Sequence, residues 1–376
     1  MSDTYKIVIY DPAHKKKVAA LQTHLWTRDV GLATRYFEWK YEENPYSKEP
    51  LIYLAFQGSE LVGMRGFYGA KWELGRPREV HTVLVADDFV ISPQHRDRGL
   101  VTLIMNAAFE DLAQRGHKHV FNLSGGGLTV LGSLAMGWKS AGPLEPIGSG
   151  TGPAFRRRLR EFLKQKPFFR KDADSPLLQS AAERKPFARL DRGSQVRANG
   201  SVLFEREPRP GAMSELVSSL GHDGRIRHVR DREFFAWRFG NPLRIYRFLY
   251  LGDSPLDGYL VLECAHSTTP EPRRVKIVDL EAAHPGLRTE LLEAAIRSGR
   301  FAELFAWAAT FPDGARQYLA ARGFKPVDLE WRAHGCPCVL VRPVLPKSVD
   351  SDWVLGQQRL TDLASWDMRM LYTMAA

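Results

Sequence analysis

The sequence contains little cysteine and no long hydrophobic run. Its 376 residues include three cysteines, at positions 264, 336 and 338. These are too few and too clustered for a disulfide framework, so we expect a reducing compartment. No stretch approaches the roughly 20 apolar residues that a membrane-spanning helix needs. The first residues also lack the pattern of a secretory signal, and we therefore expect a cytoplasmic protein.

The cysteines do not predict a metal site either. Cys336 and Cys338 follow His334 but are separated by a single residue. Zinc sites usually have a wider spacing and a second pair of ligands, and the sequence offers no such pair. We therefore expect no metal.

The charge is unbalanced toward lysine and arginine, with a formal net charge of +10 at pH 7. Such an excess favours anionic partners. Nucleic acid is one such class, but coenzyme A and acyl carrier proteins are anionic as well. Charge alone does not distinguish among these partners, and we do not expect nucleic acid to be the one that binds.

The order of the predicted elements indicates a sheet flanked by helices. Apolar residues make up 44% of the chain, and its length suits two or three domains. We predict strands at 5–10, 51–56, 60–64, 82–91 and 120–123, and helices at 16–26 and 100–115. Gly116 is placed to cap the second helix. This order predicts an α/β (α+β) fold with a mixed, mostly antiparallel central sheet.

Two similar stretches indicate an internal repeat. Tyr36–Pro45 reads YFEWKYEENP, and Phe234–Pro242 reads FFAWRFGNP. Similar strand and helix patterns surround both stretches, so we predict two copies of one fold. We interpret Trp39 and Trp237 as core residues rather than ligand-binding anchors.

The repeat sets the predicted domain boundaries. We expect a first copy at 1–150, a basic linker at 151–200, a second copy at 201–345 and a C-terminal tail at 346–376. Within the linker, residues 155–166 carry a helical apolar stripe opposite a basic face. Such a helix could rest on an anionic membrane or a carrier protein, or it could pack on its own domain.

The stretch between residues 87 and 105 holds the strongest candidate for a functional site. A strand ends near Pro93, a polar turn containing Gly99 follows, and a helix begins at about Leu100. Unpaired backbone N–H groups converge at the start of a helix, where the helix dipole is positive. We therefore expect an anion site at this turn.

The same stretch resembles the acetyl-CoA signature of the GNAT acetyltransferase superfamily. Ile91-Ser92-Pro93 and Arg96-Asp97-Arg98-Gly99-Leu100-Val101 occupy the positions of Val-x-Pro and Arg-Gly-x-Gly-x-Gly/Ala. Asp97 and Val101 depart from the pattern. The resemblance covers about residues 5–145, and it implies that the loop amides hold the coenzyme pyrophosphate while the preceding strand pairs with the pantetheine arm. The residues implied to bind acetyl-CoA, or another acyl-CoA as co-substrate, are Phe89, Val90, Ile91, Arg96, Asp97, Arg98, Gly99, Leu100, Val101, Thr102 and Asn122.

The resemblance also implies the catalytic groups. A carboxylate on the strand before the loop would take the amine proton through water, and Asp87 and Asp88 stand there with side chains expected on opposite faces. Many relatives use a Tyr four residues before a closing Gly as the acid, and this position holds Ser133. A bound water, Ser133 or a Tyr from elsewhere could protonate the thiolate. No cysteine adjoins the motif, so we expect direct transfer without an acyl-enzyme.

The remaining candidates have weaker patterns. His95 and His117 could act as bases, but we expect them at the surface. The segment Ser124–Gly127 could let a ligand approach the backbone or could be a plain turn. The second copy has no Arg-x-x-Gly loop near His284. We therefore expect it to bind no coenzyme and to shape the acceptor cleft instead.

The predicted function is an N-acyltransferase of the GNAT type. It would transfer an acyl group, acetyl by default, from coenzyme A to a primary amine such as an amino sugar, an aminoglycoside or an amino-acid-like molecule. An acyl carrier protein or a membrane surface are further candidate partners. The alternative is a non-catalytic protein of the same fold that senses coenzyme or binds a partner through basic patches. The sequence does not indicate the oligomeric state.

Overall fold

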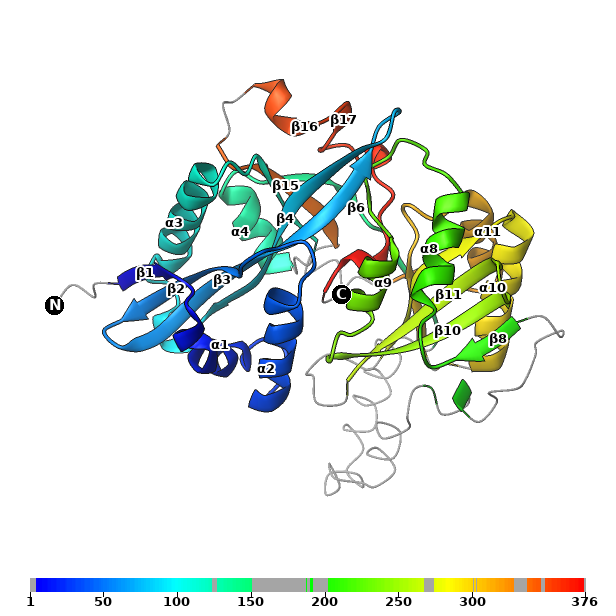
Figure 1. The fold of residues 1–376 in the computed structure, drawn as a ribbon, viewed down its shortest axis with the longest axis horizontal. Helices are drawn as coiled ribbons and strands as arrows, with labels where there is room; N and C mark the ends of the chain where they lie inside the picture. The colour runs from blue at the N-terminus through cyan, green and yellow to red at the C-terminus, as the bar shows by residue number, and fades with distance from the viewer. Residues whose placement is uncertain are drawn as a thin grey trace, which may run out of the picture.

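The computed structural model describes residues 5–123, 127–150, 187, 190–191, 202–266, 274–299, 301, 303–327, 337–345 and 349–374. Most of its elements gather into two large sheets, each with its own helices, side by side along the long axis of the molecule (Figure 1). A third sheet contains only β16 (Val354–Leu355) and β17 (Gln358–Arg359) among the described strands. The amphipathic segment predicted at 155–166, the residues 124–126 and Cys336 lie outside the described residues.

The first sheet contains most strands of the first half. Its order is β1 (Tyr5–Ile9), β2 (Leu51–Gln57), β3 (Glu60–Leu74), β4 (Glu79–Ile91), β5 (His119–Asn122), β15 (Cys338–Pro343) and β6 (Lys139–Pro143). The short β9 (Arg227–His228) pairs with β3 off this path. On one face lie α1 (Lys15–Gln22), α2 (Val30–Phe37) and the π-helical turn η2 (Glu38–Glu42). On the other lie α3 (Leu100–Gln114) and α4 (Gly127–Ala135).

The second sheet repeats this order. It runs β8 (Val202–Glu205), β10 (Arg244–Gly252), β11 (Leu256–Ala265), β12 (Val275–Ala282), β13 (Glu303–Trp307), β7 (Pro146–Gly150) and β14 (Lys325–Pro326). Its helices are α8 (Pro210–Ser219), α9 (Arg232–Arg238), α10 (Pro285–Gly299) and α11 (Asp313–Ala321). Among the described strands, each large sheet has one parallel pair near its middle, β4 with β5 and β12 with β13, and its other pairs are antiparallel. The predicted pair of mixed, mostly antiparallel sheets is confirmed.

The two sheets exchange one strand each. β7 follows β6 after two residues, yet it pairs with β13 and β14 in the second sheet. In return, β15 from the second half fills the place between β5 and β6 in the first sheet. The strand pairing therefore differs from a division at residue 150, because each sheet is completed by a strand from the other half of the chain.

The repeated stretches meet at the seam between the two sheets. The indole rings of Trp39 and Trp237 stack with centroids 5.0 Å apart and planes 13° from parallel. Each indole N–H donates to the backbone carbonyl of the other tryptophan, at 2.7 and 2.8 Å. The reciprocal bonds give the seam an approximate two-fold symmetry. Both residues are buried, as predicted.

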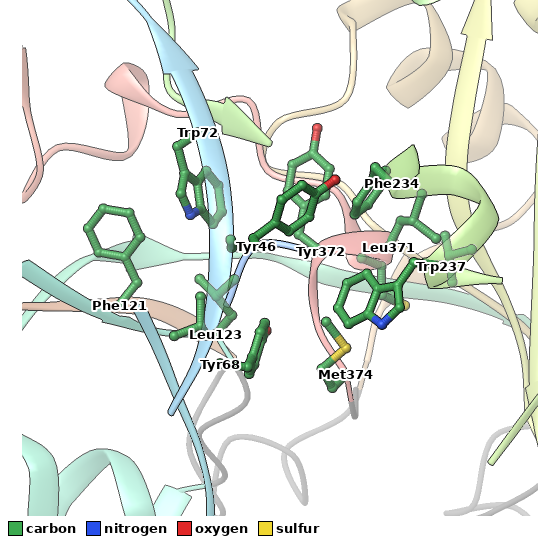
Figure 2. Close-up of a cluster of buried hydrophobic side chains, with 14 of the residues drawn as sticks. Tyr46, Tyr68, Trp72, Phe121, Leu123, Phe234, Trp237, Leu371, Tyr372 and Met374 are labelled. Carbon is green, nitrogen blue, oxygen red and sulfur yellow. The ribbon is translucent and has the colours of Figure 1, made fainter. Parts of the chain in front are cut away.

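The C-terminal segment is a central part of the core. Between residues 349 and 374, Trp366, Leu371 and Tyr372 are almost completely buried. Figure 2 shows Leu371, Tyr372 and Met374 among side chains from both halves of the chain, including Trp72 and Trp237. The segment predicted as a tail therefore joins the two halves through apolar burial.

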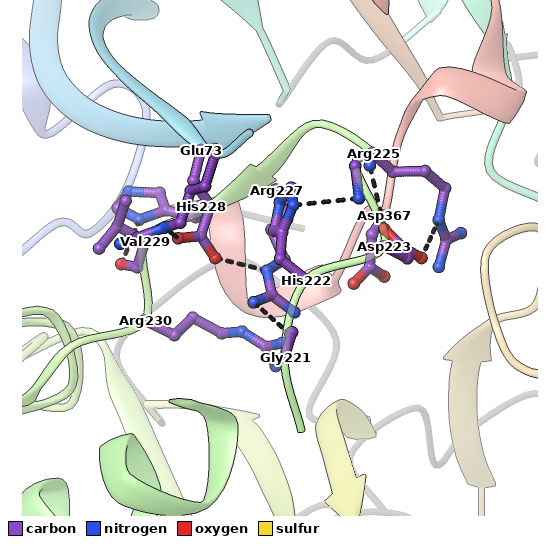
Figure 3. A network of polar contacts seen from close by, with 12 residues as sticks. Glu73, Gly221, His222, Asp223, Arg225, Arg227, His228, Val229, Arg230 and Asp367 are labelled. Atoms are coloured by element: carbon purple, nitrogen blue, oxygen red, sulfur yellow. Dashed lines mark hydrogen bonds and ion pairs between the residues drawn. The ribbon is translucent and has the colours of Figure 1, made fainter. Parts of the chain in front are cut away.

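Charged residues close the outer end of the same seam. Glu73, at the end of β3, accepts hydrogen bonds from Arg227 of β9 and from Arg78. Arg227 also donates from Nη2 to the carbonyl of Gly221 at 2.9 Å, as Figure 3 shows. This network attaches the second half of the chain to the long β3–β4 hairpin.

Candidate active site

A bulge in β4 decides which way the predicted catalytic carboxylates point. The β3–β4 register slips by one residue between Met64 and Gly66. Before the slip, odd-numbered β4 residues such as Val85 face α1 and α2; after it, even-numbered ones such as Val90 do. Asp88 lies in the slip with a positive φ of 50°. The expectation that Asp87 and Asp88 face opposite sides is therefore wrong, because a bulge breaks the alternation of a strand.

Asp88 is bound by the protein at every acceptor position. Its Oδ1 accepts from Trp26 Nε1 at 2.7 Å and from Lys40 Nζ at 2.9 Å. Its Oδ2 accepts from Gln22 Nε2 at 2.9 Å and from the Tyr41 hydroxyl at 2.7 Å. A carboxylate has about four acceptor directions. Asp88 therefore holds the bulge in place and has no direction left for a substrate proton.

Asp87 retains more capacity. Its Oδ2 accepts from Lys40 Nζ at 2.7 Å and its Oδ1 from the Asp88 amide at 3.0 Å. Two of its acceptor directions are unused by the described residues. Burial raises the pKa of Asp87, Lys40 opposes this change, and the neighbouring Asp88 carboxylate adds to it. A carboxylate with a raised pKa accepts a proton more readily than one with an ordinary pKa.

Lys40 is the centre of this cluster, and sequence reasoning did not single it out. Its ammonium is completely buried and lies 5.2 to 5.7 Å from the ring centroids of Tyr36, Tyr41, Tyr68 and Trp26. Burial alone would lower the pKa of Lys40, but Asp87 and Asp88 outweigh it, so that the pKa is raised. The repeated stretch that contains Trp39 could have pointed to Lys40, because in both copies a basic residue follows the tryptophan among aromatic residues.

The loop between β4 and α3 has the backbone of an anion site. Gly99 precedes the first helical residue with φ of 74° and offers no side chain as a cap. Asp97 also has a positive φ, 59°, which is the conformation that the glycine it replaces would adopt easily. The first helical amides follow, with Leu103 the first to donate back, to Gly99. Arg96 and Arg98 are exposed beside them.

The space beside this loop is a gap between two parallel strands. β4 and β5 are paired only at Leu84 with Val120 and Val85 with Phe121. β4 continues to Ile91, and along residues 86–91 no described strand pairs with its β5 side. On its other edge, β5 pairs with β15 along its whole length, from His119 opposite Pro343 to Asn122 opposite Leu340. An unpaired stretch of strand can hydrogen-bond an extended, amide-containing ligand.

The other predicted site residues are distributed over both faces of the sheet. Phe89 and Ile91 pack on the α3 side, and Leu100 is buried beneath the helix start. Ser133 is buried on α4, a helix that packs on the α3 side, whereas the Asp87 and Asp88 carboxylates lie on the α1 side. The structure thus brings the two aspartates together but not Ser133 with them. Its role as an acid stays a prediction, as do those of Val101 and Thr102 in coenzyme binding.

The expected surface position of His95 is wrong. The side chain is 7% exposed and hydrogen-bonds through Nδ1 to the Tyr5 hydroxyl at 3.2 Å. The loop from Ser92 to Gly99 places the imidazole against β1, so that His95 attaches the loop to this strand. His117, at the other end of α3, is partly buried.

No described group of side chains suits a metal. Among the residues that the structure places, no three His, Cys, Asp or Glu side chains gather closely enough to hold an ion. None of the described helices has both the length and the apolar character needed to cross a bilayer.

The comparisons with known proteins agree with this architecture. Residues 18–125 match the model of the acetyltransferase (GNAT) family. No curated protein sequence matches the chain. A tandem GNAT protein from the clavulanic acid biosynthesis pathway has a similar structure, with a TM-score of 0.52 and 15% identity, over 92% of this chain and 100% of that one.

Two other solved structures are similar over most of this chain. One is a probable N-acyltransferase from Enterococcus faecalis V583, and the other is a GCN5-related N-acetyltransferase from Anabaena variabilis ATCC 29413. Each has a TM-score of 0.55 and 11% identity, and the match covers 91% of this chain and 73% of the other. At these identities the likeness shows the fold. Residues 18–125 therefore form a GNAT acetyltransferase domain, in a chain that has the length and the two sheets of two GNAT-like domains.

Proposed function

We propose that the chain is an N-acyltransferase that moves an acyl group, acetyl by default, from coenzyme A directly to a primary amine. Acyl transfer in general follows from the GNAT domain. Dependence on coenzyme A, the amine acceptor and a cytoplasmic location are our proposals. An amino sugar, an aminoglycoside or an amino-acid-like molecule would suit an acceptor site between the two halves, and an acyl carrier protein is an alternative source of the acyl group.

The observation that carries the proposal is the loop from Ser92 to Gly99. Its two left-handed residues and the uncapped start of α3 direct backbone N–H groups outward, which suits a pyrophosphate. A Cβ added at Gly99 would meet no atom within 4 Å, so the loop leaves open space beside the backbone. The unpaired edge of β4 next to it suits the two amides of pantetheine.

The chemistry needs few further groups. The neutral amine attacks the thioester carbonyl, a C–N bond forms, the C–S bond breaks, and the amine proton leaves while the thiolate takes one up. Backbone N–H groups near the β4 bulge can stabilise the developing oxyanion. Asp87 is the carboxylate with acceptor capacity left, and water can carry the proton to it. Ser133, a bound water or a tyrosine would return a proton to the thiolate.

Coenzyme binding to the full-length protein tests this proposal. Titration calorimetry with acetyl-CoA should give binding that Gly99→Trp weakens by about a hundredfold or more, because a large side chain would fill the space beside the loop. Arg96→Ala should weaken it about tenfold, as expected for one charge-assisted hydrogen bond.

Gly116→Trp is the matched control for this test. Gly116 ends the same helix, is exposed, has a φ of 81°, and a Cβ there would also meet nothing within 4 Å. The two variants therefore share their backbone strain and differ only in which end of α3 they block. Equal binding by both variants would mean that the loop does not hold the coenzyme, and no binding of any acyl-CoA by the unaltered protein would favour the alternative of a non-catalytic protein that binds a partner through basic patches.

A further inference from the structure

Arg65 is a buried cation on the face of β3 that α3 covers. It stands between the two β3 residues that flank the β4 bulge. Its guanidinium carbon lies 5.6 Å from the ring centroid of Phe67 and 5.1 Å from that of Phe89. Phe67 belongs to the core beneath α3, and Phe89 packs against the same core. Arg65 is only 3% exposed.

Among the residues that the structure describes, no carboxylate contacts Arg65 directly. Within the described part of the chain, Arg65 has neither a hydrogen bond nor an ion pair, and its Nε is buried without a partner. Burial lowers the pKa of Arg65 to about 10, opposed most by Asp87. Asp87, however, faces the other side of the sheet, where it binds Lys40. By contrast, Arg230 and Arg238 of the second half each contact a carboxylate. A buried cation without a partner is costly, so its position suits an anionic ligand.

The position of Arg65 excludes the phosphates as that ligand. The anion loop begins after Ile91, whereas Arg65 lies across from the bulge at Asp88 and Phe89. Two residues of strand, roughly 7 Å, separate Phe89 from Ile91 before the loop even starts. A coenzyme with its phosphates on the loop amides would therefore extend its uncharged pantetheine arm back along β4. The part of the donor that reaches the level of Arg65 is the acyl group.

We propose that Arg65 selects an acyl-CoA whose acyl group ends in a carboxylate. This inference rests on the proposed function and names its donor. The planar guanidinium, supported by two aromatic rings, can bind a carboxylate through two parallel hydrogen bonds. The transfer is otherwise unchanged: the amine forms the C–N bond, the C–S bond breaks, and the products are an amide that keeps the terminal carboxylate and free coenzyme A thiol.

Calorimetry with pairs of donors of equal size tests this inference on the full-length protein. Malonyl-CoA is compared with isovaleryl-CoA, and succinyl-CoA with 4-methylvaleryl-CoA, since each pair differs mainly in the charge at the end of the acyl group. In at least one pair the charged donor should bind ten to a hundred times more tightly, the range for one charge-assisted contact. Arg65→Met should abolish this ratio while changing the affinity for coenzyme A itself less than about twofold. Arg65→Lys should keep part of the ratio.

Arg230→Met is the control for a purely structural effect. Arg230 is buried and paired in the second half, so its loss should lower stability and leave the donor ratio unchanged. Equal affinities within both donor pairs in the unaltered protein would overturn the inference, and so would a ratio that survives Arg65→Met. If coenzyme A itself does not bind, the proposed function is wrong and this inference falls with it. Binding of coenzyme A without a charge preference would overturn only the inference.

Discussion

In the first half of the chain the residues Ser92 to Gly99 connect the long strand β4 to α3, whereas in the second half only Ala283 and His284 connect β12 to α10. In the second half, β12 also has a bulge, between the residues that pair with Val261 and Leu262, and both halves bury acidic residues close to their bulge. Asp279 and Glu281 bind Arg230 in the second half, much as Asp87 and Asp88 bind Lys40 in the first.

This comparison separates what the fold needs from what a coenzyme needs. Because buried acidic residues with a basic partner recur in the half without the loop, they belong to the construction of the bulge. The loop occurs once, and it is the part that can hold an anion. The loop is therefore better evidence for coenzyme binding than the carboxylates of β4 are, even though these carboxylates lie next to the motif.

The largest expected effect concerns the independence of the two halves. Because β7 and β15 are exchanged, a fragment of residues 1–175 would lack a strand between β5 and β6, and a fragment of 176–376 would lack one between β13 and β14. Expressed alone, each should fail to show a cooperative unfolding transition, since the missing strand leaves two unpaired edges inside a sheet. Expressed together, they should form a one-to-one complex, seen by size-exclusion chromatography and thermal unfolding.

The full-length protein with a protease site between residues 175 and 176 is the control for that experiment. Cleavage after folding should leave the complex intact and its melting temperature close to that of the uncut protein. A stable, cooperatively folded monomer from either fragment would show that the exchange is not required and that the halves are separate domains.

The next largest effect distinguishes the two buried clusters. Lys40→Met and Arg230→Met should each lower the free energy of unfolding by about 3–5 kcal/mol, because each leaves buried carboxylates without their partner. Only Lys40→Met should also weaken acetyl-CoA binding, since the bulge that it holds lies on the strand that leads into the loop. Denaturant unfolding and calorimetry on the same samples measure both quantities.

Lys15→Met is the surface control for these two variants. Lys15 pairs with Glu42 at 2.7 Å but is partly exposed, so its loss should cost less than about 1 kcal/mol. The distinction between the halves would fail if Arg230→Met weakened coenzyme binding as strongly as Lys40→Met does.

Local patterns predicted most elements of the fold but not their pairing. The strands β2 to β4, the helix α3 and its cap at Gly116 follow from apolar periodicity and glycine placement, and the repeat predicted the second copy. The exchange of β7 and β15 could not be predicted, because the sequence of a strand does not name its partner and both pairings join residues more than 150 positions apart.

The candidate site was predicted in part for a similar reason. The loop around Gly99 has a local signature, so sequence sufficed. The orientation of Asp87 and Asp88 depended on a bulge, which inverts every side chain after it without a distinctive residue. Lys40 and Arg65 were missed because lysine and arginine are usually exposed, and only the folded chain shows that both are buried.

The smallest predicted effect is a pH dependence that sharpens the difference between the halves. Trp39 and Trp237 are 198 residues apart, and the same offset relates His228 to Val30. Val30 is exposed, whereas His228 is buried at the seam against Phe234 and Tyr372. Its Nδ1–H donates to the Val229 carbonyl at 2.9 Å, and its Nε2 has no partner among the described residues. Burial lowers the pKa of His228 from 6.5 to about 3.

The sign follows from where the proton binds. Between pH 6.5 and 3 the unfolded chain protonates His228 and the folded chain does not, so the contribution of this residue to stability is complete above pH 6.5 and is lost as the pH falls. The loss should approach 1.4 kcal/mol per pH unit, or about 2 kcal/mol at pH 5.

His228→Phe keeps an aromatic ring but cannot titrate, so its unfolding free energy should fall less steeply between pH 7.5 and 5 than that of the unaltered protein. His24→Phe, at an exposed position after α1, is the control for exchanging a histidine for a phenylalanine. Parallel pH profiles for His228→Phe and the unaltered protein would mean that the imidazole is protonated in the folded state, and the seam would then hold a buried charge in the second half as β4 does in the first.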